Sequence, residues 1–204
     1  MPISNYFLIL GIPETADEKA VDAAFEHLSN SLKASNFTDS QKTVDQATRC
    51  MALVREAHTV LRDENFRKKH SDEVKAAGEP YSPDQLKPFL GHVCVAAGII
   101  SYQELMDAVS KQTDIDLPLG QILQERRLIT QTELEGMLMG QKLYGAPMRP
   151  LENLTKRLLA LEVITLDMVK IAVIDQRTSM ASLDELMTKR GWVSPALLDA
   201  LKQV

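Results

Sequence analysis

An all-α fold is predicted by three features of the 204-residue sequence. Apolar residues recur at three- and four-residue steps over long stretches, which is the period of an amphipathic helix. No stretch of useful length alternates between apolar and polar residues, as a half-buried strand would. A unit of 24 residues, with the layout of two short helices, recurs four times after residue 88.

Prolines and glycines divide the chain into segments, because these residues interrupt helices and favour turns. They cluster at 78–88 and again at 145–150. We therefore predict an N-terminal domain at 1–77, a linker at 78–88, a first repeat pair at 89–144, a linker at 145–152 and a second, divergent repeat pair at 153–204.

Composition and charge exclude several classes of protein. Hydrophobic residues make up 45% and charged residues 25%, as in an average globular chain. Lys plus Arg total 23 against 28 for Asp plus Glu, so the basic surplus typical of a nucleic-acid-binding protein is absent and we expect no nucleic-acid partner. No run approaches the roughly 20 apolar residues that span a bilayer, and the N-terminal residues lack the layout of a signal peptide. We expect a cytoplasmic protein without membrane insertion.

Cysteine and histidine usage predicts no metal site and no catalytic centre. Cys50 and Cys94 stand in separate segments without a CxxC or Cys/His cluster, which favours two reduced, buried thiols over a disulfide. The four histidines are scattered without the spacing of metal ligands. The sequence also contains no phosphate-binding loop or metalloprotease motif. We therefore expect a protein that is not an enzyme and has no cofactor.

Two amphipathic helices are predicted in the N-terminal domain. Thr15 and Glu18 have the spacing of a capping box, so the first helix is expected to begin there. Residues 33–42 are polar and are expected to form the loop of an antiparallel helix pair. The predicted apolar stripes comprise Val21, Ala24, Phe25, Leu28 and Leu32 in the first helix and Ala47, Met51, Val54, Ala57, His58 and Leu61 in the second.

Three stretches of this domain resemble the J-domain of DnaJ-type co-chaperones: YFLILGIP at 6–13, AF at 24–25 and AHTVLRD at 57–63. The resemblance covers residues 5 to about 72. In that family a His-Pro-Asp motif in the loop is required by the heat-shock chaperone ATPase, whereas Lys33-Ala34-Ser35 stand at that place here. The resemblance therefore implies a degenerate J-like fold without co-chaperone activity, and we expect no heat-shock chaperone ATPase as a partner.

The repeated unit begins at residues 89, 118, 153 and 182. The starts are 29, 35 and 29 residues apart, so the copies group into two pairs. Each copy begins with an apolar segment of about two helical turns that ends at a tight turn. Gly98 and Gly191 stand at this turn in the first and fourth copies, where a positive φ would favour glycine. Since one such helix pair cannot bury both of its apolar stripes, we expect two small helical subdomains.

A hydroxyl residue is predicted to cap the second helix of each copy. Ser101 and Thr130 are each followed three residues later by glutamate, which is the spacing of a capping box. Ser194 is followed by Pro195, and proline is well tolerated at the first helical position.

The tandem units at 89–141 resemble the MshEN domain, the N-terminal region of type II secretion and type IV pilus ATPases, and the units at 153–204 resemble it less well. In that family the Arg-Leu-Gly opening and the closing Gln of both motifs bind cyclic di-GMP. The resemblance therefore implies a candidate cyclic di-GMP site formed by Leu90, Gly91, Gly98, Leu105 and Gln112 of the first copy and by Leu119, Gly120, Leu134 and Gln141 of the second.

This sequence departs from the MshEN pattern at its cationic positions. Phe89 and Pro118 stand where the family has arginine, and Arg127 replaces the internal glycine of the second copy. Two guanidinium groups that could pair with phosphate or stack on guanine are thereby missing.

Two interpretations of the Leu-Gly and Gln positions stay open, since they could serve helix packing or nucleotide binding. We predict a non-catalytic adaptor or regulatory protein that binds unidentified protein partners in a bacterial signalling, secretion or motility setting, with a cyclic di-GMP receptor as the alternative. Trp192 is expected to be either an exposed interface anchor or a buried contact between copies. The methionines of the C-terminal part could provide adaptable partner contacts or fill the core: Met137, Met139, Met148, Met168, Met180 and Met187.

Overall fold

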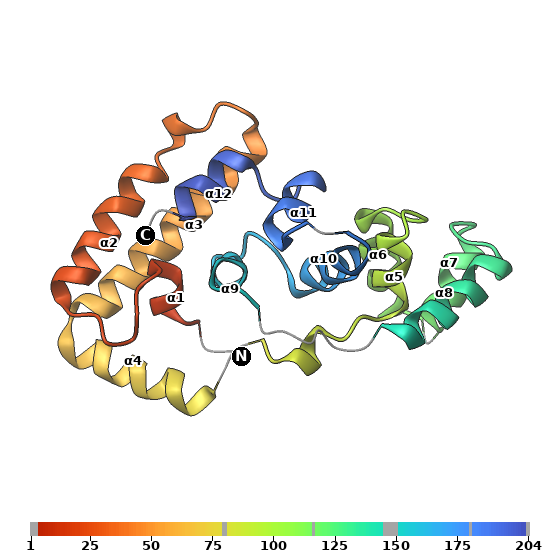
Figure 1. The fold of residues 1–204 in the computed structure, drawn as a ribbon, viewed down its shortest axis with the longest axis horizontal. Coiled ribbons are helices and arrows are strands. Elements are labelled where there is room, and N and C mark those ends of the chain that lie inside the picture. Colours follow the sequence, from red (N-terminus) through yellow and green to blue (C-terminus); the bar gives the residue numbers. More distant parts are fainter. Residues whose placement is uncertain (1–3, 79–80, 116, 145–150, 180, 203–204) are drawn as a thin grey trace. The chain divides into compact units, whose positions relative to one another are not determined.

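Figure 1 shows the fold of the chain in a computed structural model, which describes residues 4–78, 81–115, 117–144, 151–179 and 181–202. Every regular element in these ranges is a helix, which confirms the predicted all-α fold. No helix in the same ranges combines the length and the apolar character needed to cross a bilayer.

The described residues form two compact units. Unit 1 draws on the segments 1–82, 151–165 and 184–204, and unit 2 on 83–150 and 166–183. Unit 1 holds α1 (Tyr6–Leu10), α2 (Glu18–Ser31), the short 3-10 helix η1 (Ala34–Asn36), α3 (Gln41–Arg62), α4 (Glu64–Ala77), α9 (Asn153–Ala160), all of α11 (Leu183–Lys189) but its first residue, and α12 (Pro195–Lys202). Unit 2 holds the 3-10 helix η2 (Pro83–Leu86), α5 (Leu90–Ala96), α6 (Tyr102–Gln112), α7 (Leu119–Glu125), α8 (Gln131–Leu143) and α10 (Leu166–Thr178).

The segment 153–204 contributes helices to both units. Its helices α9, α11 and α12 are grouped with the N-terminal helices, whereas α10 is grouped with the first repeat pair. The predicted boundaries follow proline and glycine in the sequence, whereas the units follow packing between helices that are distant in the chain.

The start of α2 differs from the prediction. The helix begins at Glu18 and is capped by Asp17, whose Oδ1 accepts a hydrogen bond from the Ala20 N–H at 2.9 Å. Thr15 lies in the turn before the helix, so the predicted capping box of Thr15 and Glu18 is wrong. Aspartate is among the strongest N-cap residues, and here it stands two residues nearer to the apolar stripe than the threonine does.

The predicted antiparallel pair is formed by α2 and α3. Its direction is shown by two contacts between the start of α2 and the end of α3: His58 Nε2 lies 2.7 Å from Asp22 Oδ1, and Arg62 Nε lies 3.8 Å from Glu18 Oε1. The ring of His58 also stacks on Phe25, with 4.0 Å between centroids. The predicted stripes supply the buried face, in which Val21, Leu28, Ala47, Val54, Ala57 and Leu61 are all 0% exposed.

A buried arginine ties α9 to α1 and α12 in unit 1. Arg157 donates from Nε to the Ile9 carbonyl at 3.2 Å and from Nη1 to the Leu201 carbonyl at 2.6 Å. Both carbonyls lie at helix C-termini, where acceptors lack intrahelical partners and the helix dipole favours a cation. Burial lowers the pKa of this guanidinium to about 10, so it stays charged at neutral pH. Gly11 leaves room for the group, because a Cβ at this residue would lie 2.7 Å from Arg157 Cζ.

The turn between α11 and α12 is attached to the first turns of α3. Lys42 Nζ donates to the Gly191 carbonyl at 2.7 Å, and Gln46 Nε2 donates to the Trp192 carbonyl at 3.1 Å. Trp192 is 8% exposed, so this side chain is buried and not an exposed anchor. The fourth repeat thereby becomes part of the core around the N-terminal helices.

Three buried titratable groups are held in their neutral forms. Burial raises the pKa of the Cys50 thiol to about 12 and that of the Cys94 thiol to about 11, and both are free thiols as expected. Burial lowers the pKa of His70, whose Nε2 accepts a hydrogen bond from the Tyr6 N–H at 3.1 Å. A neutral imidazole therefore supports the first turn of α1.

The four repeats share one backbone plan. Their second helices α6, α8, α10 and α12 all begin at the fourteenth residue of the unit. The tenth residue of every copy has a positive φ: 72° at Gly98, 56° at Arg127, 55° at Glu162 and 68° at Gly191. In each copy the N–H of this residue donates three residues back and the next N–H donates five residues back, as in a Schellman motif. The positive φ predicted for both glycines is confirmed.

The predicted caps at Ser101, Thr130 and Ser194 are also confirmed. The hydroxyls of Ser101 and Thr130 accept from the backbone N–H three residues later, and the glutamate at that position reaches back to the capping residue. Ser194 Oγ accepts from the Leu197 N–H at 3.2 Å, and Pro195 is the first residue of α12.

Replacing Arg157 by methionine should lower the free energy of unfolding by about 2–4 kcal/mol, because two helix-end carbonyls would lose their charged donor in a buried place. Urea unfolding followed by circular dichroism measures the change. Arg49→Met, at an exposed position on α3, is the matched control and should shift stability by less than about 0.5 kcal/mol. Equal stability of the two variants would contradict the role assigned to Arg157.

Candidate functional site

Six of the nine candidate nucleotide-site residues meet in a packed seam of unit 2. A Cβ added at Gly91 would overlap Leu105 Cδ1 of the same copy and lie 3.2 Å from Leu119 Cδ2 of the next copy. A Cβ added at Gly120 would lie 2.8 Å from Leu134 Cδ1 and 3.5 Å from Leu90 Cδ2. Each glycine is thus packed against two leucines. One comes from the second helix of the same copy, and the other is the leucine of the Leu-Gly pair in the other copy.

This reciprocal packing explains why glycine stands at both positions. Gly91 and Gly120 are buried, and any larger residue would have to displace a leucine side chain. The packing interpretation of the two Leu-Gly pairs therefore has a direct geometric basis.

The other three candidate residues lie elsewhere in the repeats. Gly98 is exposed at the end of α5, with no atom within 4 Å of the Cβ position. Gln112 Nε2 donates to the Leu117 carbonyl at 3.1 Å, and Gln176, at the same place in the third copy, donates to the carbonyl five residues later at 3.4 Å. Gln141 is half-buried near the end of α8. In two copies the closing glutamine thus holds the segment that follows its helix.

A polar cluster joins α5 to α10 beside Phe89. His92 is 6% exposed; its Nδ1 accepts from the Phe89 N–H at 2.8 Å, and its Nε2 lies 2.9 Å from Asp167 Oδ1. Since Nδ1 is an acceptor, this geometry assigns the proton to Nε2, which donates to the carboxylate. The hydrogen bond from His92 holds the pKa of Asp167 below its usual range, and the nearby charge of Lys170 acts in the same direction.

Lys170 is a buried cation of this cluster that sequence analysis did not single out. It is 8% exposed on α10, with Nζ 3.5 Å from Asp167 Oδ1 and 4.9 Å from the centroid of the Phe89 ring. A positive charge is therefore present beside residue 89, although the residue itself is aromatic. No periodicity or spacing could reveal this, because the lysine comes from the third copy.

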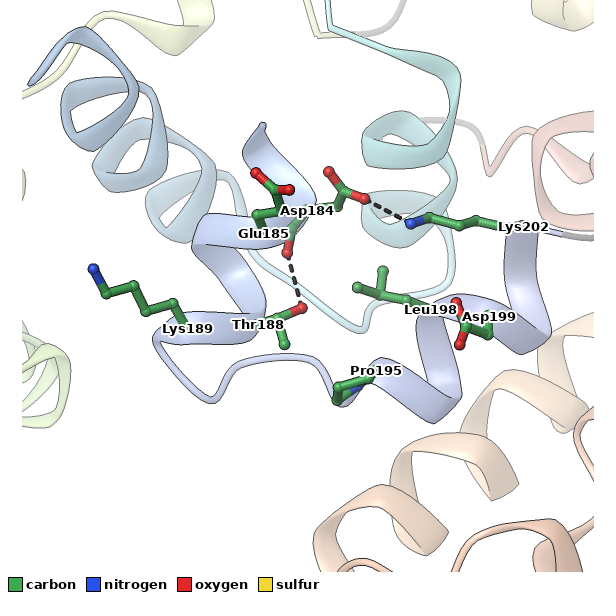
Figure 2. A pocket seen from close by; sticks show the side chains of 8 residues that line it. All are labelled: Asp184, Glu185, Thr188, Lys189, Pro195, Leu198, Asp199 and Lys202. Carbon is green, nitrogen blue, oxygen red and sulfur yellow. Dashed lines mark hydrogen bonds and ion pairs between the residues drawn. The ribbon is translucent and has the colours of Figure 1, made fainter. Parts of the chain in front are cut away.

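A surface pocket of about 390 Å³ lies between α11 and α12. Figure 2 shows Asp184 and Lys202 reaching toward each other across it, and their charged atoms lie 2.8 Å apart. Thr188 Oγ1 donates to the Asp184 carbonyl at 2.9 Å. The remaining lining side chains are Glu185, Lys189, Pro195, Leu198 and Asp199. The pocket mixes both signs of charge, and the described residues contain no group of three metal-ligating side chains.

The helix α8 presents apolar side chains to solvent. None of its thirteen residues is buried, and Leu138, Met139 and Leu143 are 42%, 71% and 80% exposed. Unit 2 also exposes Phe89, Val109 and Ile115. Large apolar groups that stay exposed often mark an interaction surface. The sequence carried a signal for this, because the apolar residues of 131–143 are spread around the helix instead of forming one stripe.

The methionines of the C-terminal part are divided between the core and the surface. Met187 is 0% exposed and fills the core of unit 1, whereas Met139 is exposed on α8. Met137 and Met168 are half-buried. Met148 and Met180 lie outside the described residues.

Comparison of this chain with protein-family models, with curated proteins and with solved structures finds no match. The resemblances to J-domains and to MshEN domains therefore stay predictions from the residues quoted for them.

Gly91→Ala should lower the free energy of unfolding by about 1–3 kcal/mol, because the added methyl group would displace Leu105 in a packed seam. Gly136→Ala on α8 is the matched control, since nothing lies within 4 Å of its Cβ position, and it should raise stability by about 0.5–1 kcal/mol. Thermal and urea unfolding measure both effects. A neutral Gly91→Ala variant would contradict the packing role of the Leu-Gly pair.

Proposed function

We propose that this chain is a non-catalytic adaptor that works in the cytoplasm and binds a protein partner through α8. The observation that carries the proposal is the exposure of Leu138, Met139 and Leu143 on a helix without any buried residue. Exposed leucine and methionine suit contact with an apolar face of another protein, and the flexible thioether adapts to different shapes.

The placement of the Leu-Gly pairs supports an adaptor over a ligand sensor. Leucine side chains of both copies occupy the space beside Gly91 and Gly120, and the Gln112 side-chain amide already donates a hydrogen bond to the Leu117 carbonyl. Contacts within the repeats are thus sufficient to explain the residue types at these positions, without a bound ligand. The J-like helices support the same proposal, because Lys33, Ala34 and Ser35 lie at the start of η1 in place of the His-Pro-Asp motif that a co-chaperone needs.

A receptor for cyclic di-GMP is the second candidate function, and one contact favours it. The Lys170 ammonium lies 4.9 Å from the centroid of the Phe89 ring, so a cation and an aromatic face are present where the MshEN pattern has arginine. The Asp167 carboxylate 3.5 Å from this ammonium offsets its charge, which weakens attraction for a dianion. The MshEN resemblance also favours a signalling, secretion or motility setting for either function.

Two measurements separate the candidate functions. For the adaptor we expect no heat on titration with cyclic di-GMP at concentrations far above the micromolar range. Binding that is lost in Gln112→Ala would instead establish the receptor. This variant is preferred to Gly91→Ala, because the glutamine is exposed and its replacement leaves the leucine seam intact.

A photo-crosslinking residue at Leu138 should capture a defined partner in cells, and Leu138→Asp should weaken that complex at least about tenfold, as loss of an apolar anchor does. Gln103→Asp, at an exposed position on α6, is the matched control and should leave the complex unchanged. A partner bound equally well by both variants would contradict the role of α8.

A further inference from the structure

The exposed face of α8 carries a second pattern besides Leu138. Five exposed residues, Glu135, Gly136, Met139, Lys142 and Leu143, are defined here as the α8 stripe. At 3.6 residues per turn they fall within roughly 120° of the helix circumference. Met139 lies at the middle of the arc, with Glu135 and Lys142 on one flank and Gly136 and Leu143 on the other.

Spacing along the helix makes the stripe self-complementary. At 1.5 Å per residue, Glu135 lies about 6 Å before Met139 and Lys142 about 4.5 Å after it. A second α8 running in the opposite direction, related by a two-fold axis beside Met139, would bring its Lys142 to within about 1.5 Å of the height of Glu135. The same operation creates the reciprocal pair, so two ion pairs of opposite charge would flank the centre.

The other flank is complementary in shape. Nothing lies within 4 Å of a Cβ added at Gly136, so the helix surface is open there. The same two-fold axis would place Leu143 of the second copy opposite this opening, and Leu143 is 80% exposed, the highest value among the large apolar side chains that the structure describes. Met139, at 71% exposed, would meet its own counterpart on the axis.

We propose that the α8 stripe binds the α8 stripe of a second copy of this chain, in an antiparallel helix pair. This proposal rests on the role of α8 in the proposed function and names one occupant of that helix. Isologous two-fold contacts of this kind are the commonest in homo-oligomers. A parallel two-fold pair would place the flank of Glu135 and Lys142 against the Gly136 flank of the other copy, so both ion pairs form only in the antiparallel arrangement.

The charges of the stripe are available for this contact. Lys142 makes no ion pair with the residues that the structure describes, and Glu135 accepts a hydrogen bond only from the exposed Gln131 amide, at 2.6 Å. Two helices of thirteen residues bury less than a standard interface of ~1,600 Å². The dimer is therefore expected to be weak and to exchange with the monomer.

Sedimentation equilibrium of the full chain up to about 1 mM, a range in which weak interfaces associate, tests the proposal. We expect a reversible dimer. Glu135→Lys and Lys142→Glu should each weaken it at least about fivefold, because each places two like-charged pairs in the contact. The double variant Glu135→Lys with Lys142→Glu should return the affinity to within about threefold of the unaltered chain, since the ion pairs are restored in reverse.

Cysteine substitution gives an independent readout. Met139→Cys should form a disulfide-linked dimer under mild oxidation, whereas Ser110→Cys at an exposed position on α6 should not. Circular dichroism checks that each variant keeps its helices. A monomer at every concentration, or a dimer that responds neither to the charge variants nor to Met139→Cys, would overturn the proposal.

The two functions of α8 can fail separately. A monomeric chain that still captures a partner through Leu138 overturns self-pairing and leaves the adaptor standing. A dimer with charge rescue but no captured partner supports self-pairing and removes the adaptor.

Discussion

A residue with positive φ ends the first helix of every repeat, and the organisation of the C-terminal part depends on it. At this residue the chain reverses within a few positions, so that two helices fit into 24 residues. The next N–H donates to the carbonyl five residues back in all four copies, which satisfies the helix end. Isoleucine or valine then follows and is buried in every copy: Ile100, Ile129, Ile164 and Val193. The turn thereby sets which side chains enter the core.

Copies with one backbone plan have different neighbours because residues at matching positions differ. The first and fourth positions of the first copy hold Phe89, which caps α5, and the buried His92, which binds Asp167 of α10. The matching positions of α7 hold Pro118 and Gln121, and both are exposed. At the fifth position, where the first two copies hold the buried Val93 and Ile122, the third copy holds Arg157, whose side chain is buried against the ends of α1 and α12. The repeats thus contribute helices to both units.

The sequence predicted what depends on neighbours in the chain. Helix periodicity, the caps at Ser101 and Thr130 and the turns at Gly98 and Gly191 all follow from residues a few positions apart. The left-handed conformation of Glu162 was detectable only by aligning the copies, because no glycine marks it. The cap predicted at Thr15 was wrong because a second residue of good capping type, Asp17, lies nearer to the apolar stripe and caps α2 instead.

Contacts between distant segments could not be predicted in this way. The bond from Arg157 to the Ile9 carbonyl and the contact of the Lys170 ammonium with Phe89 each span more than 70 residues of sequence, from helices whose own pattern indicates only an amphipathic face. The candidate site was predicted in part: six of its nine residues do meet, but in a packed seam, and the exposed stripe of α8 was not foreseen.

The shared turn is tested most directly by exchanging glycine and non-glycine residues at the tenth position. Arg127→Gly and Glu162→Gly should each raise the free energy of unfolding by about 1 kcal/mol, because both exposed side chains now occupy a conformation that costs L-residues about 1–2 kcal/mol. Gly98→Ala and Gly191→Ala should lower it by a similar amount. Stability that falls in the first pair of variants, or is unchanged in the second, would contradict a single backbone plan for the four copies.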